Sequence, residues 1–499
     1  MSLQFITGGS GAGKSEYLSR LVCEESVRRP HDNFIVVVPE QYTMETQKKL
    51  VHMHSRKGIL NIDVVSFERL AYKVFEELGG GNRPVLDDTG KNLIVRRVLE
   101  KEKKKLDYFG SSIEKTGFVS ELKSVISELL QYGITPQQLG EIGENVKEKQ
   151  QLSAKLKDIR LVYEEFMAFL STNYITSEEI LDVLCGLVEK SKLIAGSEII
   201  FDGFTGFTPI QYKLMRLLLV YSKGIKISVT IDKKERPTGH EGWNNLFFMS
   251  KEMMNRLIAI CEEEGINVDD TVCVDRDINY RYEGAKDLAY LERNLFRYKG
   301  GVYTGTPENI RIYEGSNPKE ELQYIVSEIL QLTRKEGFRY RDIAVVTADL
   351  ETYGKVAANM MKQNDIPAFL DYKRSVAANP YVEMLCSALE IVEKGYPYDT
   401  MFRYLRTGLT GISRHDIDML ENYCLAVGIR GSRAWHEPWK KKMKRSTYQP
   451  ELETLNALRE QIMAPFLNLE AVLKDKEANV RAYVTAVYEF VTALHSAEQ

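Results

Sequence analysis

Eight residues near the start of the chain have the types and spacing of a phosphate-binding loop. They are Gly8, Gly9, Ser10, Gly11, Ala12, Gly13, Lys14 and Ser15, which fit the pattern G-x-x-x-x-G-K-[ST] at every position. In this pattern the glycines let backbone N–H groups surround a phosphate, the lysine reaches the β and γ oxygens, and the final hydroxyl binds Mg²⁺. The sequence therefore predicts an ATP site at this loop.

A phosphate loop needs a strand before it and a helix after it. The apolar residues 3–7 precede the loop, and a helix-forming run over residues 16–23 follows it. The N-terminal end of such a helix adds partial positive charge to the site. A chance match within a glycine-rich segment is the alternative, and the flanking elements argue against it.

An ATP site also needs an acidic residue at the end of a buried strand to hold Mg²⁺. Asp202 closes the strand expected over residues 198–202, so Ser15 and Asp202 are the predicted Mg²⁺ ligands. A plain turn aspartate is the alternative interpretation of Asp202. The next residue is Gly203, where a glutamate that polarises the attacking water is usually found.

The missing glutamate bears on catalysis, because loss of a general base typically costs on the order of 10²–10⁴ in rate. A sensor glutamine is also missing from residues 230–233, and the loop begins too early for an upstream glutamine motif that reads adenine. We therefore predict that the chain contains no catalytic residue for ATP hydrolysis.

Composition limits the classes of protein to consider. The chain has 499 residues, 43% hydrophobic content and a formal net charge of −4, so charge alone does not indicate a nucleic-acid-binding protein. Its six cysteines are scattered without a C-x-x-C pair, which argues against zinc or a disulfide framework. No long apolar run or signal peptide is present. We expect a cytoplasmic protein that does not enter a membrane.

The order of expected elements predicts an α/β domain interrupted by helices. Strands are expected over residues 34–38, 62–65 and 225–230, and residues 88–192 have helical periodicity. Beyond a glycine-rich linker, residues 310–313 and 342–346 are expected to be strands on either side of a helix over 319–334. From residue 396 the pattern is helical, and the abrupt end suggests a fragment of a longer protein.

Seven blocks in chain order carry a resemblance to a known family. They are residues 8–15, 36–41, 65–71, 83–90, 201–211, 291–296 and 421–431. The first three blocks resemble the first motifs of the superfamily 1 DNA helicases. Together the seven resemble the AddB subunit of bacterial AddAB helicase–nucleases, over the whole chain.

The resemblance implies an α/β fold of the P-loop NTPase, superfamily 1 helicase-like type. It implies two RecA-like parallel-sheet domains with helical inserts. Domain 1A would comprise residues 1–80 and 197–299, and the helical insert 1B residues 81–196. Residues 308–395 would be the first part of domain 2A, and residues 396–499 a truncated helical domain 2B.

The resemblance also implies site residues. Asp202 matches the motif II position, and Ser66 and Phe67 match motif Ib, so Ser66, Phe67 and the neighbouring Arg69 are predicted DNA contacts. The alternative is that Ser66 caps a helix and Phe67 lies in the core. Thr347 and Ala348 stand where active helicases have an arginine, which again argues against a working motor.

Partners and cofactors follow from the same resemblance. Family members pair with an AddA-type helicase/nuclease subunit as a heterodimer, and act as hydrolases on single- and double-stranded DNA. They are more than twice as long as this chain, and their C-terminal part holds a nuclease with an iron–sulfur cluster. The cysteines here lack that spacing, so ATP and Mg²⁺ are the only cofactors expected in this portion.

The sequence thus predicts the helicase-like, ATP- and single-stranded-DNA-binding portion of a helicase/exonuclease subunit. The family's role is double-strand break repair by homologous recombination, on the side that recognises the Chi sequence. We expect no motor activity from this chain. An active superfamily 1 motor and a non-catalytic scaffold with a vestigial P-loop are the alternatives.

Overall fold

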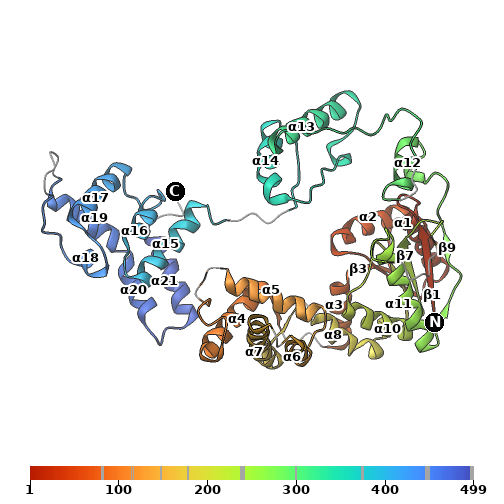
Figure 1. Ribbon diagram of the computed structural model, residues 1–499, viewed down its shortest axis with the longest axis horizontal. Coiled ribbons are helices and arrows are strands. Elements are labelled where there is room, and N and C mark those ends of the chain that lie inside the picture. The colour runs from red at the N-terminus through yellow and green to blue at the C-terminus, as the bar shows by residue number, and fades with distance from the viewer. Residues whose placement is uncertain are drawn as a thin grey trace. The chain divides into compact units, whose positions relative to one another are not determined.

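The computed structural model describes residues 1–79, 84–113, 115, 117–146, 149–176, 179–235, 242–297, 301–371, 376–443 and 450–494. The chain forms two compact units, Met1–Ile312 and Tyr313–Gln499 (Figure 1). All sequence-predicted ATP and DNA residues lie in the first unit.

A parallel sheet is the centre of the first unit. Its strands lie in the order β3-β2-β6-β7-β1, and the short strands β8 and β9 pair with β1, all in parallel. The bounds are β1 Ser2–Gly8, β2 Asn33–Val37, β3 Ile62–Val65, β6 Ser197–Phe201, β7 Gly224–Thr230, β8 Asn267–Val268 and β9 Val272–Cys273. The five longer strands confirm the strands expected from apolar runs.

Helices cover both faces of this sheet, because its strands are apolar on both sides. Ile35 and Val37 of β2 pack in one core cluster with side chains of α3, α10 and α11, whereas Phe34 and Val36 pack in another with side chains of α1 and α2. The helices are α1 Lys14–Arg28, α2 Thr43–Met53, α3 Phe67–Leu78, α10 Pro209–Tyr221 and α11 Phe248–Glu264. The period-two alternation sends neighbouring residues to opposite faces.

A helical insert separates β3 from β6. Its helices α4 Asp88–Glu102, α5 Phe118–Gln131, α6 Pro136–Asn145 and α7 Gln150–Asn173 follow one another, and α4, α5 and α7 share a core of their own. The short strands β4 Val85–Leu86 and β5 Ile175–Thr176 pair where the chain enters and leaves the insert. Ile180 and Leu184 of α8 Ile180–Cys185, by contrast, belong to the sheet core. The exact domain limits stay a prediction.

All the regular elements described in the second unit are helices. Its helices are α13 Pro318–Lys335, α14 Leu350–Gln363, α15 Pro380–Lys394, α16 Tyr398–Leu405, α17 Arg414–Val427, α18 Ser432–His436, α19 Leu452–Met463, α20 Phe466–Lys474 and α21 Val480–Ala493. The helix expected over residues 319–334 is confirmed as α13. Helices α9 Lys192–Ala195 and α12 Lys286–Asn294 complete the α-helices of the first unit.

The two strands expected on either side of α13 are not formed. Residues 310–313 and 342–346 have no strand pairing in the structure, and residues 301–371 are all described. Ile312 and Val346 are 96% and 90% exposed. A β-branched run becomes a strand only when neighbouring strands satisfy its backbone and cover its side chains, and no such neighbour lies among the described residues. The prediction of a second parallel sheet is therefore wrong for this structure.

Two further findings concern the whole described chain. No helix among the described residues is both long and apolar enough to cross a bilayer. All six cysteines are free thiols, of which Cys273 and Cys386 are exposed.

Candidate nucleotide site

The phosphate loop connects β1 to α1 at the carboxyl edge of the sheet. Gly11 and Gly13 have φ values of 70° and 94°, in the left-handed region that glycine adopts without a side-chain clash. Gly13 is the N-cap of α1 and supplies no side-chain acceptor. The first N–H groups of a helix have no acceptor within the helix, so those of α1 can donate to an anion bound in the loop. The loop therefore has the backbone of an anion site.

Lys14 bends back over the loop. Its Nζ donates to the carbonyl oxygens of Gly8 at 2.9 Å and Gly9 at 3.0 Å. Burial lowers the pKa of Lys14, and the negative charges of Asp202 and Asp275 partly oppose this shift. The ammonium is thus a half-buried cation that lies among carboxylates.

Asp202 lies directly after β6 at the same edge of the sheet. Its backbone N–H donates to the Val37 carbonyl at 3.1 Å, which continues the β2–β6 ladder by one residue. The Ser228 hydroxyl of β7 donates to Asp202 Oδ1 at 2.6 Å, which orients the carboxylate. Because β7 lies between β6 and β1, Asp202 and the loop are two strands apart in the sheet. Ser15 is exposed at the first turn of α1.

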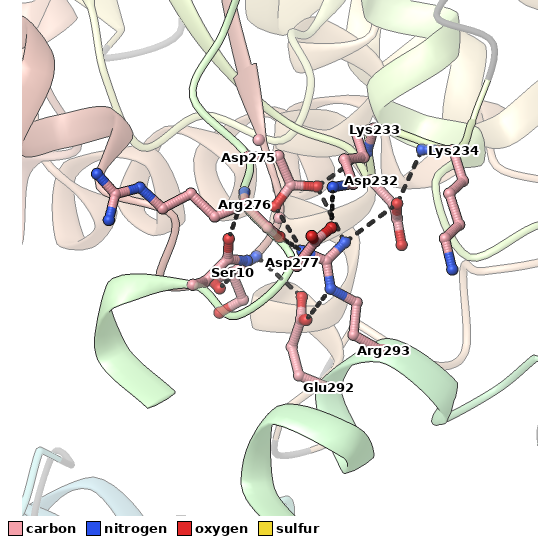
Figure 2. Close-up of polar contacts among 12 residues, drawn as sticks. Ser10, Asp232, Lys233, Lys234, Asp275, Arg276, Asp277, Glu292 and Arg293 are labelled. Atoms are coloured by element: carbon pink, nitrogen blue, oxygen red, sulfur yellow. Dashed lines mark hydrogen bonds and ion pairs between the residues drawn. The ribbon is translucent and has the colours of Figure 1, made fainter. Parts of the chain in front are cut away.

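A segment that the sequence did not assign to the site packs directly on the loop. The Ser10 N–H donates to Glu292 Oε1 at 3.2 Å, and the Asn279 side chain donates to the Ser10 carbonyl at 3.2 Å. The Arg281 N–H donates to the Gly11 carbonyl at 3.3 Å. Figure 2 shows Glu292 extending from α12 toward Ser10.

Glycine is required in the loop for this close approach. A Cβ built at Gly9 would lie 2.9 Å from Glu292 Oε1, and one at Gly11 would lie 2.6 Å from the Arg281 Cβ. The block 291–296 carries part of the family resemblance, but nothing in the sequence places it beside residues some 280 positions earlier. The parallel pairing of β9 with β1 is what brings this segment to the loop.

A buried ion cluster holds α12 in this position. Arg293 pairs with Asp275 at 3.0 Å and with Asp232 at 3.3 Å (Figure 2). The side chain of Asp275 is fully buried. Burial raises the pKa of Asp275, but the Lys233 N–H and the Arg293 guanidinium outweigh this, so its pKa is lowered. Burial raises the pKa of the neighbouring Glu292 above its usual range.

The three predicted DNA contacts lie at the start of α3. Ser66 is 6% exposed and is the N-cap, its hydroxyl accepting from the Arg69 N–H at 3.3 Å. Phe67 is 8% exposed, and its ring packs against Phe201, with ring centroids 5.7 Å apart, and against two other phenylalanines. The Arg69 side chain is exposed and pairs with Glu40 at 2.9 Å. Ser66 and Phe67 thus have the structural roles of a cap and a core residue, and a DNA contact stays a prediction.

Comparison with known proteins places the chain in a family. Residues 5–292 match the family model described as "ADDB, N-terminal". The chain belongs to the AddB family. This match ends at Glu292, so the AddB N-terminal region includes both the phosphate loop and most of the segment that covers it.

Individual AddB relatives match over the whole chain. The ATP-dependent helicase/deoxyribonuclease subunit of this family from Lachnoclostridium phytofermentans is 41% identical over all of this chain and 44% of its own length. The corresponding proteins from Clostridium novyi and Clostridioides difficile are 33% and 34% identical over 43% and 44% of theirs. The chain therefore spans less than half the length of the curated relatives it matches.

Replacing Arg293 by Gln should lower the free energy of unfolding by about 3–5 kcal/mol, because Asp275 would remain buried without its cation. In the wild type the pKa of Asp275 is lowered on folding. Its contribution is therefore present above the unfolded pKa of about 3.9 and is lost as the pH falls through the folded value. In R293Q, protonation of Asp275 removes the unpaired charge. The deficit should be larger at pH 7 than at pH 4, as measured by urea unfolding.

If R293Q lowers the free energy of unfolding by the same amount at pH 7 and at pH 4, the loss does not arise from the charge of Asp275.

Replacing Phe67 by Ala should lower the free energy of unfolding by about 3–5 kcal/mol, because it leaves a cavity among the phenylalanines of the sheet core. Tyr42→Ala is the control, since Tyr42 is 49% exposed and its loss should cost about 0.5 kcal/mol or less. Urea unfolding followed by circular dichroism measures both. A Phe67→Ala variant of unchanged stability that binds single-stranded DNA more weakly would instead identify Phe67 as a DNA contact.

Proposed function

We propose that this chain is the ATP-binding, helicase-like portion of an AddB subunit and does not drive translocation itself. The observation that carries the proposal is a complete phosphate loop at the carboxyl edge of a parallel sheet, with Asp202 at the same edge and no carboxylate after it. Ligands of open parallel sheets bind at this edge. The RecA-like character of the sheet domain is part of the proposal.

The residues of the loop fit a nucleoside triphosphate with Mg²⁺. The N–H groups at the start of α1 would hold phosphate oxygens, and Lys14 would turn from the Gly8 and Gly9 carbonyls toward the β and γ oxygens. The Ser15 hydroxyl and Asp202 would hold Mg²⁺, which neutralises phosphate charge when bound. The Ser228 hydroxyl keeps Asp202 oriented for this role.

The absence of a water-polarising carboxylate beside Asp202 supports binding without rapid turnover. The contact of Glu292 with the loop acts on binding instead, because it places a negative charge at the phosphate site and so opposes the entry of a nucleotide. The same contact favours the second candidate, a scaffold whose P-loop stays empty of nucleotide. Calorimetry separates the two, since only the first candidate binds ATP.

The names of the relatives give two further activities, helicase and deoxyribonuclease. We propose that this chain pairs with an AddA-type subunit and holds single-stranded DNA during double-strand break repair by recombination. The exposed Arg69 is the residue of the predicted DNA set that is available to a phosphate backbone. A second basic segment, residues 440–445, could also contact a phosphate backbone, but residues 444 and 445 lie outside the described residues. Trp435 and Trp439 beside it are buried in the helical core and are therefore not exposed to stack on a base.

Titration of the chain with ATP and Mg²⁺ in a calorimeter should show binding that Lys14→Ala abolishes. Asp202→Asn should weaken only the Mg²⁺-dependent part, because it removes one metal ligand. Asp182→Asn is the matched control, since Asp182 is an exposed acid paired with Lys213. No heat of binding for the wild type at any Mg²⁺ concentration would favour the scaffold.

A steady-state ATPase assay with single-stranded DNA should show turnover far below the roughly 1–10³ s⁻¹ typical of enzymes. Turnover within that range, abolished by Lys14→Ala, would establish the chain as a motor and contradict the proposal.

A further inference from the structure

The loop that should receive phosphate is already engaged by a later part of the same chain. Glu292 accepts from the Ser10 N–H at 3.2 Å, while Asn279 and the Arg281 N–H donate to the Ser10 and Gly11 carbonyls. A phosphate oxygen in such a loop accepts from the same kind of backbone N–H. The Glu292 carboxylate therefore makes the contact that a bound phosphate would make.

The contact of Glu292 with the loop is held in place by the packing and the ion pairs around it. Its side chain is 19% exposed, and its Oε1 lies close to Gly9, where a Cβ would come within 2.9 Å. The next residue, Arg293, is held by the buried Asp275 and by Asp232. Asn279, which also contacts the loop, is only 1% exposed.

The Glu292 carboxylate also brings negative charge to the loop. It acts on Lys14 together with Asp202 and Asp275, and each favours the cationic form, but burial outweighs them and lowers the pKa of Lys14. The positive charge of Arg281 acts on Lys14 in the opposite sense to the carboxylates. A triphosphate therefore has to compete with Glu292 for the Ser10 N–H.

We propose that Glu292 is an internal competitor for phosphate, so that ATP enters the loop only when the Glu292 carboxylate leaves the Ser10 N–H. The contact is autoinhibitory, and Arg293, through its ion pairs with Asp275 and Asp232, positions it. This inference rests on the proposed function, because it requires a loop that can bind ATP.

Calorimetry with ATP and Mg²⁺ on the full chain tests the competition. Glu292→Ala removes both the charge and the acceptor, and should tighten binding roughly tenfold or more. Glu292→Gln removes the charge but keeps an acceptor oxygen, and should give an intermediate gain. Glu283→Ala is the matched control, because it removes the same charge from a side chain of the same segment that pairs with Arg276, and should leave affinity unchanged.

The outcomes separate this inference from the proposed function. Equal or weaker binding by Glu292→Ala, with clear binding by the wild type, overturns the competition and leaves the ATP site standing. An equal gain in Glu283→Ala also overturns it, because the effect would then be general electrostatics. Absence of binding in the wild type and in every variant refutes the ATP site and the competition together.

Discussion

The site depends on one topological constraint, which is that every strand of the large sheet runs parallel to its neighbours. Carboxyl ends of parallel strands meet at one edge, and here β1, β6, β7 and β9 all end there. The phosphate loop leaves β1, Asp202 follows β6, and Asp275 comes two residues after β9. Residues from three distant parts of the sequence therefore meet without any long-range covalent link.

Several carboxylates lie at this edge of the sheet, and arginines of the same unit form ion pairs with them. The buried Asp275 and Asp232 are paired by Arg293, and Arg297 adds a second contact with Asp232 at 3.3 Å. Buried carboxylates without such partners would be costly. The same pairing holds α12 against the loop, so the cluster that stabilises the edge also sets the position of Glu292. In the proposed competition, the stability of this edge and the access of phosphate would both depend on this short helix.

The sequence predicted the elements whose signal is local. β1, β2, β3, β6 and β7 are rich in apolar and β-branched residues, and α1 directly follows the phosphate-loop motif. The strands expected over residues 310–313 and 342–346 failed because strand formation depends on neighbours, and Ile312 and Val346 are exposed. For Ser66 and Phe67 at the start of α3, the sequence left open whether they contact DNA or serve as a helix cap and a core residue. The structure gives Ser66 and Phe67 the cap and core roles. Glu292 and Arg293 could not be placed, since their position depends on the pairing of β9 with β1.

The most direct test of this account is an experimental structure of the chain with ATP and Mg²⁺ bound. The account predicts phosphate oxygens on the Ser10 N–H, Lys14 turned from the loop carbonyls toward the nucleotide, Asp202 facing the metal, and Glu292 displaced. A triphosphate seated in the loop with Glu292 still hydrogen-bonded to Ser10 would contradict it.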